Sequence, residues 1–175
     1  MRRWVRRLGS LVLLAVLLAL LAWPREAERL TDARGAIVRI MDGDSLRIGD
    51  RVVRIGGVDA VELHQLCKAA DGGQWSCGLE ARAALEALVG KGDLACESRE
   101  EDRYGRAVAR CAVAGSADIG AELVRQGWAV SGDGRGDGAY LAQQAEARSG
   151  GRGIWRGSFE RPAEWRSAHP RPFAE

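Results

Sequence analysis

The sequence predicts an α+β fold with five short β-strands and about three helices, preceded by an N-terminal hydrophobic helix. Two kinds of pattern support this prediction. Short runs in which apolar and polar residues alternate are typical of half-buried strands. Longer stretches with apolar residues at helical spacing, ended by glycines, are typical of amphipathic helices. The 175 residues are enough for one compact domain with additional segments.

Residues 1–24 differ in composition from the rest of the chain. Four arginines within the first seven residues precede an apolar run over residues 8–23. Such a segment is typical of a signal peptide or a membrane anchor. The run is long for a cleaved signal and short for a membrane span, which needs about 20 residues. We therefore expect either a signal peptide or an anchor, with the N-terminus in the cytoplasm and the rest of the chain exported to an extracytoplasmic compartment.

Export would change the meaning of the net charge. The whole chain has 26 basic and 24 acidic residues, a net charge of +2. Because four arginines precede residue 8, residues 25–175 carry 22 basic and 24 acidic residues, a net charge of −2. No global positive field is therefore available to hold nucleic acid. Binding of nucleic acid would depend on a local patch and a metal ion.

The strands and helices are expected in a definite order along the chain. Residues 25–35 are charged, and we expect a tether there. The expected strands cover residues 36–41, 45–48, 51–58, 93–98 and 106–113, and the expected helices cover residues 78–89, 118–126 and 140–149. Gly49-Asp50 is the expected hairpin turn between the second and third strands.

Five strands with a helix between the third and the fourth predict an OB-type five-stranded β-barrel. We expect this domain over residues 36–155. Residues 156–175 contain three prolines, and we expect them to form an extended tail on the domain. Barrels of this type bind nucleic acids, oligosaccharides or proteins, so the fold alone does not define the function.

The chain has four cysteines, Cys67, Cys77, Cys96 and Cys111. In an exported domain this even number indicates two disulfides, for which three pairings are possible. Local geometry favours Cys67–Cys77, which would close a glycine-containing loop, and Cys96–Cys111, on two strands joined by a turn. A zinc site is the alternative, but no C-x-x-C spacing supports it.

Acidic residues gather around the first three strands. Asp42-Gly43-Asp44 places two carboxylates around a glycine, and Asp59 and Glu62 follow. Carboxylates bind hard divalent cations. Without other signals, this D-G-D sequence would be read as a hairpin turn and Glu62 as a solvated loop residue.

Two arginines, Arg54 and Arg106, are candidates for binding phosphate oxygens. A guanidinium group binds phosphate through two hydrogen bonds and stabilises the charge that builds on phosphorus during hydrolysis. The alternative for each is an ion pair on the surface. Together with the carboxylates, they indicate hydrolysis of a phosphodiester.

Five motifs occur along residues 36–155. They are Asp42-Gly43-Asp44-Ser45, the run RIGGVDAVE at 54–62, DRYGR at 102–106, LVRQGWA at 123–129 and GIW at 153–155. In this order they resemble the staphylococcal nuclease (thermonuclease) family. Each motif alone would be a weak signal, but the set is specific.

The resemblance implies a Ca²⁺ ion held by Asp44, Asp59 and the main-chain carbonyl of Ala60, with Asp42 reaching it through water. It also implies that Glu62 acts on the attacking water as a catalytic residue.

Arg54 and Arg106 would then be the other catalytic residues, stabilising the transition state, and Tyr104 would contact the nucleotide or its phosphate. By the same resemblance, cleavage would leave a 3′-phosphate.

The chain departs from the family's pattern at two places. The family commonly has a proline where this chain has Val61, so Glu62 loses a source of rigidity. Family members also often have aromatic residues beyond the second helix, whereas residues 131–138 contain none and Tyr140 is the nearest. Stacking on an aromatic ring is worth about 1–3 kcal/mol per base, so we expect weak or sequence-tolerant binding.

The expected function is therefore that of an exported, Ca²⁺-dependent endonuclease, a monomer whose substrates are single-stranded DNA and RNA. It would also contact the membrane if the N-terminal segment remains uncleaved. The alternative is a catalytically weak or inactive OB-fold module that binds or scaffolds at the membrane. The missing aromatic residues and the negative net charge motivate this alternative.

Overall fold

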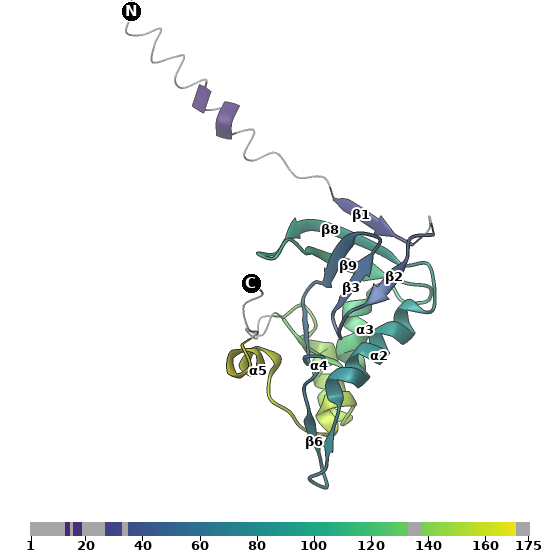
Figure 1. Cartoon of the computed structure of the whole chain (residues 1–175), viewed down its shortest axis with the longest axis vertical. Helices are drawn as coiled ribbons and strands as arrows, with labels where there is room; N and C mark the ends of the chain where they lie inside the picture. The colour runs from purple at the N-terminus through teal and green to yellow at the C-terminus, as the bar shows by residue number, and fades with distance from the viewer. Residues whose placement is uncertain (1–12, 15, 19–26, 33–34, 133–137, 171–175) are drawn as a thin grey trace, which may run out of the picture.

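The main sheet has six strands in the order β1-β8-β9-β4-β3-β2 and curls into an OB-like half-barrel (Figure 1). The structure is a computed structural model that describes residues 13–14, 16–18, 27–32, 35–132 and 138–170. The strands are Glu28–Thr31 (β1), Val38–Ile40 (β2), Ser45–Ile48 (β3), Arg51–Ile55 (β4), Ala95–Glu101 (β8) and Ala107–Ala112 (β9). Neighbouring strands are antiparallel except β4 and β9, which are parallel.

Two smaller sheets extend the fold. Val58–Ala60 (β5) pairs with Ala129–Ser131 (β10). Cys67–Ala69 (β6) lies between Gln74–Trp75 (β7) and Gly157–Ser158 (β11). The second of these sheets joins the C-terminal part of the chain to the segment that follows β5.

The three expected helices are present. They are Cys77–Val89 (α2), Ile119–Gln126 (α3) and Leu141–Ser149 (α4). Asp118 caps α3, because its side chain accepts a hydrogen bond from the Ala121 amide, and Gly127 ends this helix with a φ of 81°. A short 3₁₀ helix, Gly153–Arg156 (η1), follows α4.

The main sheet has one apolar and one polar face, as the alternation in its strands predicts. The apolar face and the helices α2 and α3 enclose the larger core. Its fully buried side chains include Leu46, Val53, Ile55, Leu85, Ile119 and Leu123. A smaller core lies where β6, α2, β10 and η1 meet, and it contains Val61, Ala81, Val130 and Ile154.

The prediction of five strands was wrong, because the main sheet alone has six in the part of the chain that the structure describes. Residues 28–31, expected within the tether, form β1 by pairing with β8. The strand expected over residues 51–58 is interrupted at Gly56-Gly57, where Gly57 has a φ of 74°. This turn directs β5 out of the main sheet and towards β10.

The segment after residue 155, expected to be an extended tail, contains β11 and a further helix, Pro162–Ala168 (α5). Pro162 stands at the start of this helix, where its missing N–H costs nothing. The helix has 7 residues, too few for an apolar period to be recognised. It packs beside β5.

Most of the expected N-terminal hydrophobic helix lies outside the described residues. Residues 13–14 and 16–18 are helical. Among the residues with a described position, no helix is long and apolar enough to cross a membrane.

Candidate active site

Two buried carboxylates lie at the centre of the candidate site. Asp44, directly before β3, is 4% exposed, and Asp59, in the middle of β5, is 0% exposed. Arg54 of β4 bridges them, with Nη1 2.8 Å from Asp44 Oδ1 and Nη2 3.0 Å from Asp59 Oδ1. The turn at Gly56-Gly57 makes this contact possible, because it brings β5 back beside the end of β4.

The turn before β3 places Asp44. The Asp44 amide donates to Asp42 Oδ1, and Asp44 Oδ2 accepts a hydrogen bond from the Ala60 amide at 2.9 Å. Gly43 is required here by close packing rather than by the tight turn that its sequence context suggested. A Cβ atom at Gly43 would lie 2.7 Å from Cβ of Ala60 and 3.0 Å from Cβ of Ala81.

The electrostatics of this pair show a shortage of positive charge. Burial raises the pKa of Asp44 to about 7, against the lowering effect of Arg54, and the carboxylates of Asp42 and Asp59 act in the same direction as burial. Burial opposes the charge of Arg54, but attraction to Asp44 and Asp59 outweighs it and raises the pKa of the guanidinium. A perturbed acid of this kind is a mark of functional sites.

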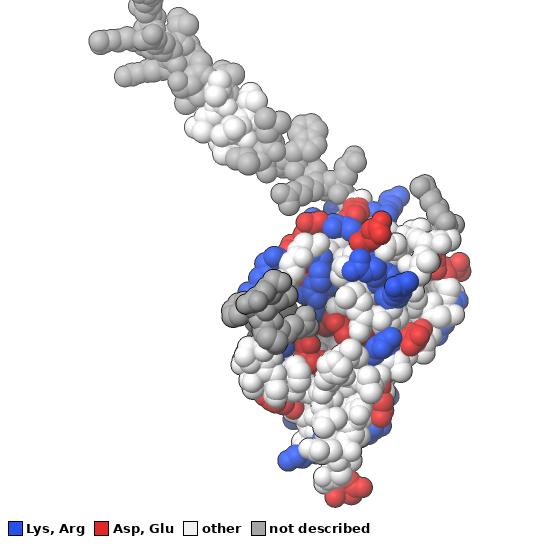
Figure 2. Space-filling model, viewed as in Figure 1, with Lys and Arg blue, Asp and Glu red and all other residues white. Residues whose placement is uncertain are grey.

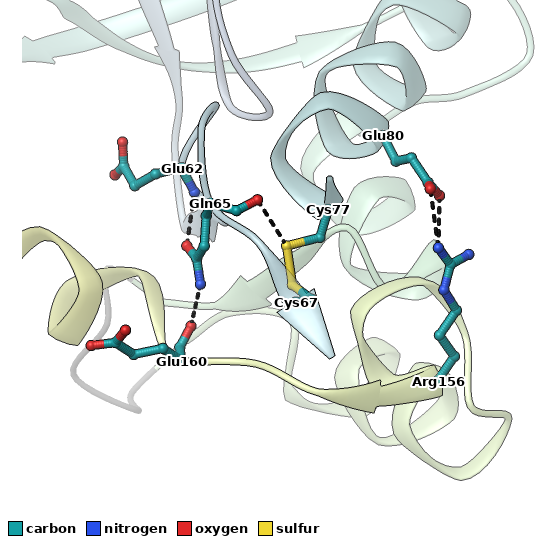
Figure 3. The surroundings of a disulfide bond; sticks show 7 residues. All are labelled: Glu62, Gln65, Cys67, Cys77, Glu80, Arg156 and Glu160. Atoms are coloured by element: carbon teal, nitrogen blue, oxygen red, sulfur yellow. Dashed lines mark hydrogen bonds and ion pairs between the residues drawn. A yellow bond between two sulfur atoms is a disulfide. The ribbon is translucent and has the colours of Figure 1, made fainter. Parts of the chain in front are cut away.

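Glu62 lies in the turn that follows β5, and a buried glutamine holds this turn. Gln65 Oε1 accepts a hydrogen bond from the Glu62 amide at 3.1 Å, and Gln65 Nε2 donates to the Glu160 carbonyl at 2.7 Å (Figure 3). The first turn of α2 also packs closely here, because a Cβ atom at Gly78 would overlap the carbonyl oxygen of Glu62. These contacts, with the buried Val61, position Glu62 without the proline that the family commonly has.

Arg106 reaches the acidic pair through Ser45. Its Nη1 lies 3.4 Å from Ser45 Oγ, which in turn donates to Asp44 Oδ1 at 3.0 Å. Asp102 orients the guanidinium by accepting from Arg106 Nε at 2.6 Å. Burial works to raise the pKa of Asp102, but hydrogen bonds from the Arg106 backbone and side chain outweigh it and lower this pKa.

The two aromatic residues near the site differ in accessibility. Tyr104 is 68% exposed, and its ring lies 5.6 Å from the Arg106 guanidinium carbon. Tyr140 is buried, and its hydroxyl donates to Asp118 at 2.9 Å. Tyr140 therefore holds the start of α3, and Tyr104 is the one of the two that a ligand can reach.

Arg166, on α5, is a site residue that the sequence analysis missed. Its Nη1 donates to Asp59 Oδ1 at 2.9 Å and to Glu62 Oε1 at 2.8 Å, and its Nη2 donates to Asp59 Oδ2 at 3.1 Å. Burial opposes its charge, but hydrogen bonds to Asp59 and Glu62 raise its pKa. Pro162 followed by Glu164 was the available signal for a helix start, but nothing in the sequence indicated where such a helix packs.

The cysteine prediction is confirmed. The structure contains the Cys67–Cys77 and Cys96–Cys111 disulfides, so the four thiols are paired and are not zinc ligands. The first disulfide joins β6 to the first residue of α2, directly behind the turn that carries Glu62 (Figure 3). The second links β8 to β9 within the main sheet.

The donor chemistry of the acidic pair fits a hard divalent cation, because buried carboxylate oxygens are the ligands that such ions prefer. Within the described ranges, no three His, Cys, Asp or Glu side chains form a group that could hold a metal. A cation here would thus depend on Asp44 and Asp59, a main-chain oxygen and water. The bond from the Ala60 amide to Asp44 places residue 60 next to this pair.

Thus an OB-like sheet brings the carboxylates of Asp44 and Asp59 together with Arg54 and, through Ser45, with Arg106, in the arrangement expected of a nuclease. The chain matches the family described as staphylococcal nuclease homologue over residues 52–157. Because this match covers more than half of its length, the chain belongs to that family.

Several individual proteins are similar to the chain. It is 37% identical over 122 residues to the succinoglycan biosynthesis protein ExoI of Rhizobium meliloti (strain 1021), covering 69% of this chain and 64% of that protein. It is 28% identical over 145 residues to an uncharacterized endonuclease of Escherichia coli, covering 80% of this chain and 86% of the relative. Protein ParB of Escherichia coli is 31% identical to the chain over 181 residues, covering 94% of this chain and 93% of that protein.

Proposed function

We propose that this protein is a Ca²⁺-dependent endonuclease that hydrolyses phosphodiester bonds of DNA and RNA. The observation that carries the proposal is the bridging of two buried carboxylates, Asp44 and Asp59, by Arg54. Burial of two carboxylates costs free energy even when an arginine pairs with them, and such buried acids are concentrated at functional sites. The endonuclease among its relatives supports the same activity.

Each residue has a definite part in the proposed reaction. The Glu62 carboxylate accepts a proton from the attacking water, whose oxygen forms the new bond to phosphorus. Arg54 and Arg106 stabilise the negative charge on the phosphate oxygens as phosphorus becomes five-coordinate. The bond from phosphorus to the 5′ oxygen breaks, and this oxygen takes up a proton from the solvent, so the products are a 3′-phosphate and a 5′-hydroxyl.

A Ca²⁺ ion held by Asp44, Asp59 and the Ala60 carbonyl would supply positive charge to the phosphate and to the water. Tyr104 lies beside Arg106, where its exposed ring is available to the nucleotide.

A strip of arginines supports binding of a nucleic-acid strand. Ser45 faces Arg54 across β3 and β4, and Arg47, two residues further along β3, faces Arg39 on β2. These side chains share the polar face of the sheet. Within the described residues neither Arg39 nor Arg47 forms an ion pair with a carboxylate, and like charges placed opposite each other are unfavourable. Figure 2 shows basic side chains on the upper part of the domain in this view, with acidic side chains among them.

We also propose that the domain is exported and that it is either released or kept on the membrane by residues 1–24. The two disulfides support this, because such bonds persist in oxidising compartments. Fractionation of cells that produce the full chain tests it. Recovery of the protein in the cytoplasm with reduced cysteines would contradict export.

The decisive experiment measures cleavage of single-stranded DNA in Ca²⁺ by the purified protein. Glu62→Gln and Arg106→Ala should each lower kcat by about 10²–10⁴-fold, because each removes a group that acts in the transition state. Glu86→Gln on α2 and Arg110→Ala on β9 are matched controls, since both side chains are exposed. Undiminished turnover in both site variants would refute these roles.

One observation favours a second candidate, an inactive OB-fold module that only binds its ligand. Arg166 occupies the carboxylates of both Asp59 and Glu62. If the purified protein binds single-stranded DNA but neither binds Ca²⁺ in calorimetry nor cleaves the strand, this second candidate is correct.

A further inference from the structure

Arg166 and a divalent cation require the same oxygen atoms. Asp59 Oδ1 accepts hydrogen bonds from both Arg54 and Arg166, and Asp59 Oδ2 accepts one from Arg166 alone. The planar guanidinium of Arg166 therefore binds the Asp59 carboxylate through two parallel hydrogen bonds, which is its strongest mode of binding.

A bound Ca²⁺ ion would compete with Arg166 for the oxygen atoms of Asp59. Carboxylate oxygens lie about 2.3–2.6 Å from Ca²⁺, and three of the four lone-pair positions of Asp59 already accept hydrogen bonds from Arg54 and Arg166. The two positive charges would also stand within a few ångströms of each other. Occupation of Asp59 by Arg166 therefore opposes occupation by a cation, and the two compete for this carboxylate.

The way in which α5 is attached allows Arg166 to leave. Gln65 binds the carbonyl of Glu160, and Pro162, the first residue of α5, is buried, so the chain is held where the helix begins. The Arg166 side chain is 39% exposed, and water can replace its contacts. Release of Arg166, by a change of its rotamer or by movement of the helix, would remove the anchor of α5 at Asp59 while the start of the helix remains attached.

We propose that α5 is a tethered competitor for the metal site: Arg166 neutralises Asp59 and Glu62 while no cation is present, and its release favours binding of a cation. This inference rests on the proposed metal-dependent function. It predicts that the cation concentration controls both the position of α5 and the access of substrate to Glu62.

The first test is calorimetric titration with Ca²⁺ alone. Arg166→Ala should bind Ca²⁺ about tenfold more tightly than the wild type, because its carboxylates need not first be freed. Arg156→Ala is the matched control, since it removes an equal charge from a side chain that is 42% exposed and is paired with Glu80. Equal or weaker affinity in Arg166→Ala would overturn the inference and leave the proposed nuclease intact. Absence of Ca²⁺ binding in both proteins would refute the metal site itself, and the inference with it.

The second test uses the wild-type protein and remains valid if the variant folds poorly. Hydrogen exchange of the amides in residues 163–168 should become faster in saturating Ca²⁺, because α5 loses its anchor at Asp59. The amides of α3 serve as the internal control and should not change. Unchanged exchange in α5 under conditions in which calorimetry shows bound Ca²⁺ would overturn the inference.

Discussion

Asp44 and Asp59 are carboxylates held in the interior, where a charged group is unfavourable unless it is paired. Arg54 compensates both of them, and Arg166 adds a second partner to Asp59. The pKa of Asp44, raised to about 7 chiefly by burial, shows that this compensation is incomplete. The protein therefore carries an electrostatic cost at this place, as is common where a site must bind a charged ligand.

Gln65 positions Glu62, and its replacement should affect both stability and catalysis. Gln65→Leu keeps the approximate volume but leaves the Glu62 amide and the Glu160 carbonyl without their partner. We expect the free energy of unfolding to fall by about 1–3 kcal/mol. We also expect kcat to fall with little change in KM, since substrate contacts are retained. Urea unfolding and steady-state kinetics measure the two effects, with the exposed Gln74→Leu as control. An unchanged kcat would show that Gln65 does not position Glu62.

Asp102 links the orientation of Arg106 to pH. Its pKa is lowered in the folded protein, so its ionised form stabilises the fold above its unfolded pKa of about 3.9. This stabilisation is lost as the pH falls through the folded pKa. Asp102→Asn should therefore lower the free energy of unfolding at pH 7 by about 1 kcal/mol. At a pH below the folded pKa of Asp102, the substitution should make little difference. Urea unfolding at several pH values from 7 downwards measures this difference, with Asp50→Asn in the exposed hairpin turn as control. A difference that is the same at every pH would contradict this role.

At the scale of elements, the strands could be predicted because their side chains alternate, whereas the break between β4 and β5 could not. The residues around Gly56-Gly57 remain apolar, so the pattern reads as one long strand. The positive φ of Gly57 turns the chain, and this turn brings Asp59 to Arg54. A two-glycine sequence is compatible with a bulge, a bend or a continuous strand.

The arginine strip on β2 and β3 should contribute to binding without taking part in the reaction. The double variant Arg39→Ala with Arg47→Ala should bind single-stranded DNA more weakly. The slope of log K against log salt should fall by about 1.4, since about 0.7 is lost per phosphate contact. Fluorescence anisotropy without Ca²⁺ measures this, with Arg148→Ala on α4 as control. An unchanged salt dependence would mean that the strand takes another path.

At the scale of the whole molecule, the two disulfides strengthen different parts. Cys96–Cys111 lies in the larger core, and Cys67–Cys77 lies in the smaller core behind the Glu62 turn. They span 15 and 10 residues. On chain entropy alone, they should stabilise the fold by similar amounts, about 3 kcal/mol each.

Removal of each disulfide should separate stability from activity. The Cys67→Ala/Cys77→Ala and Cys96→Ala/Cys111→Ala variants should both lose about 2–4 kcal/mol of unfolding free energy. A strong decrease in kcat is expected only for the first, because its disulfide supports the turn that holds Glu62. Urea unfolding and initial rates on single-stranded DNA measure the two quantities. An equal loss of kcat in both variants would show that the Glu62 turn does not depend on the nearby disulfide.

Local patterns in the sequence predicted the class of fold and the three helices and favoured the two disulfide pairs, and a set of short motifs indicated the candidate site residues. Each depends on neighbours in the chain, through alternation, helical spacing or a short motif. The tertiary structure alone decided that β5 leaves the main sheet and that α5 places Arg166 on Asp59, 107 residues away along the chain. Such a contact depends on how distant elements pack, and no local pattern encodes it.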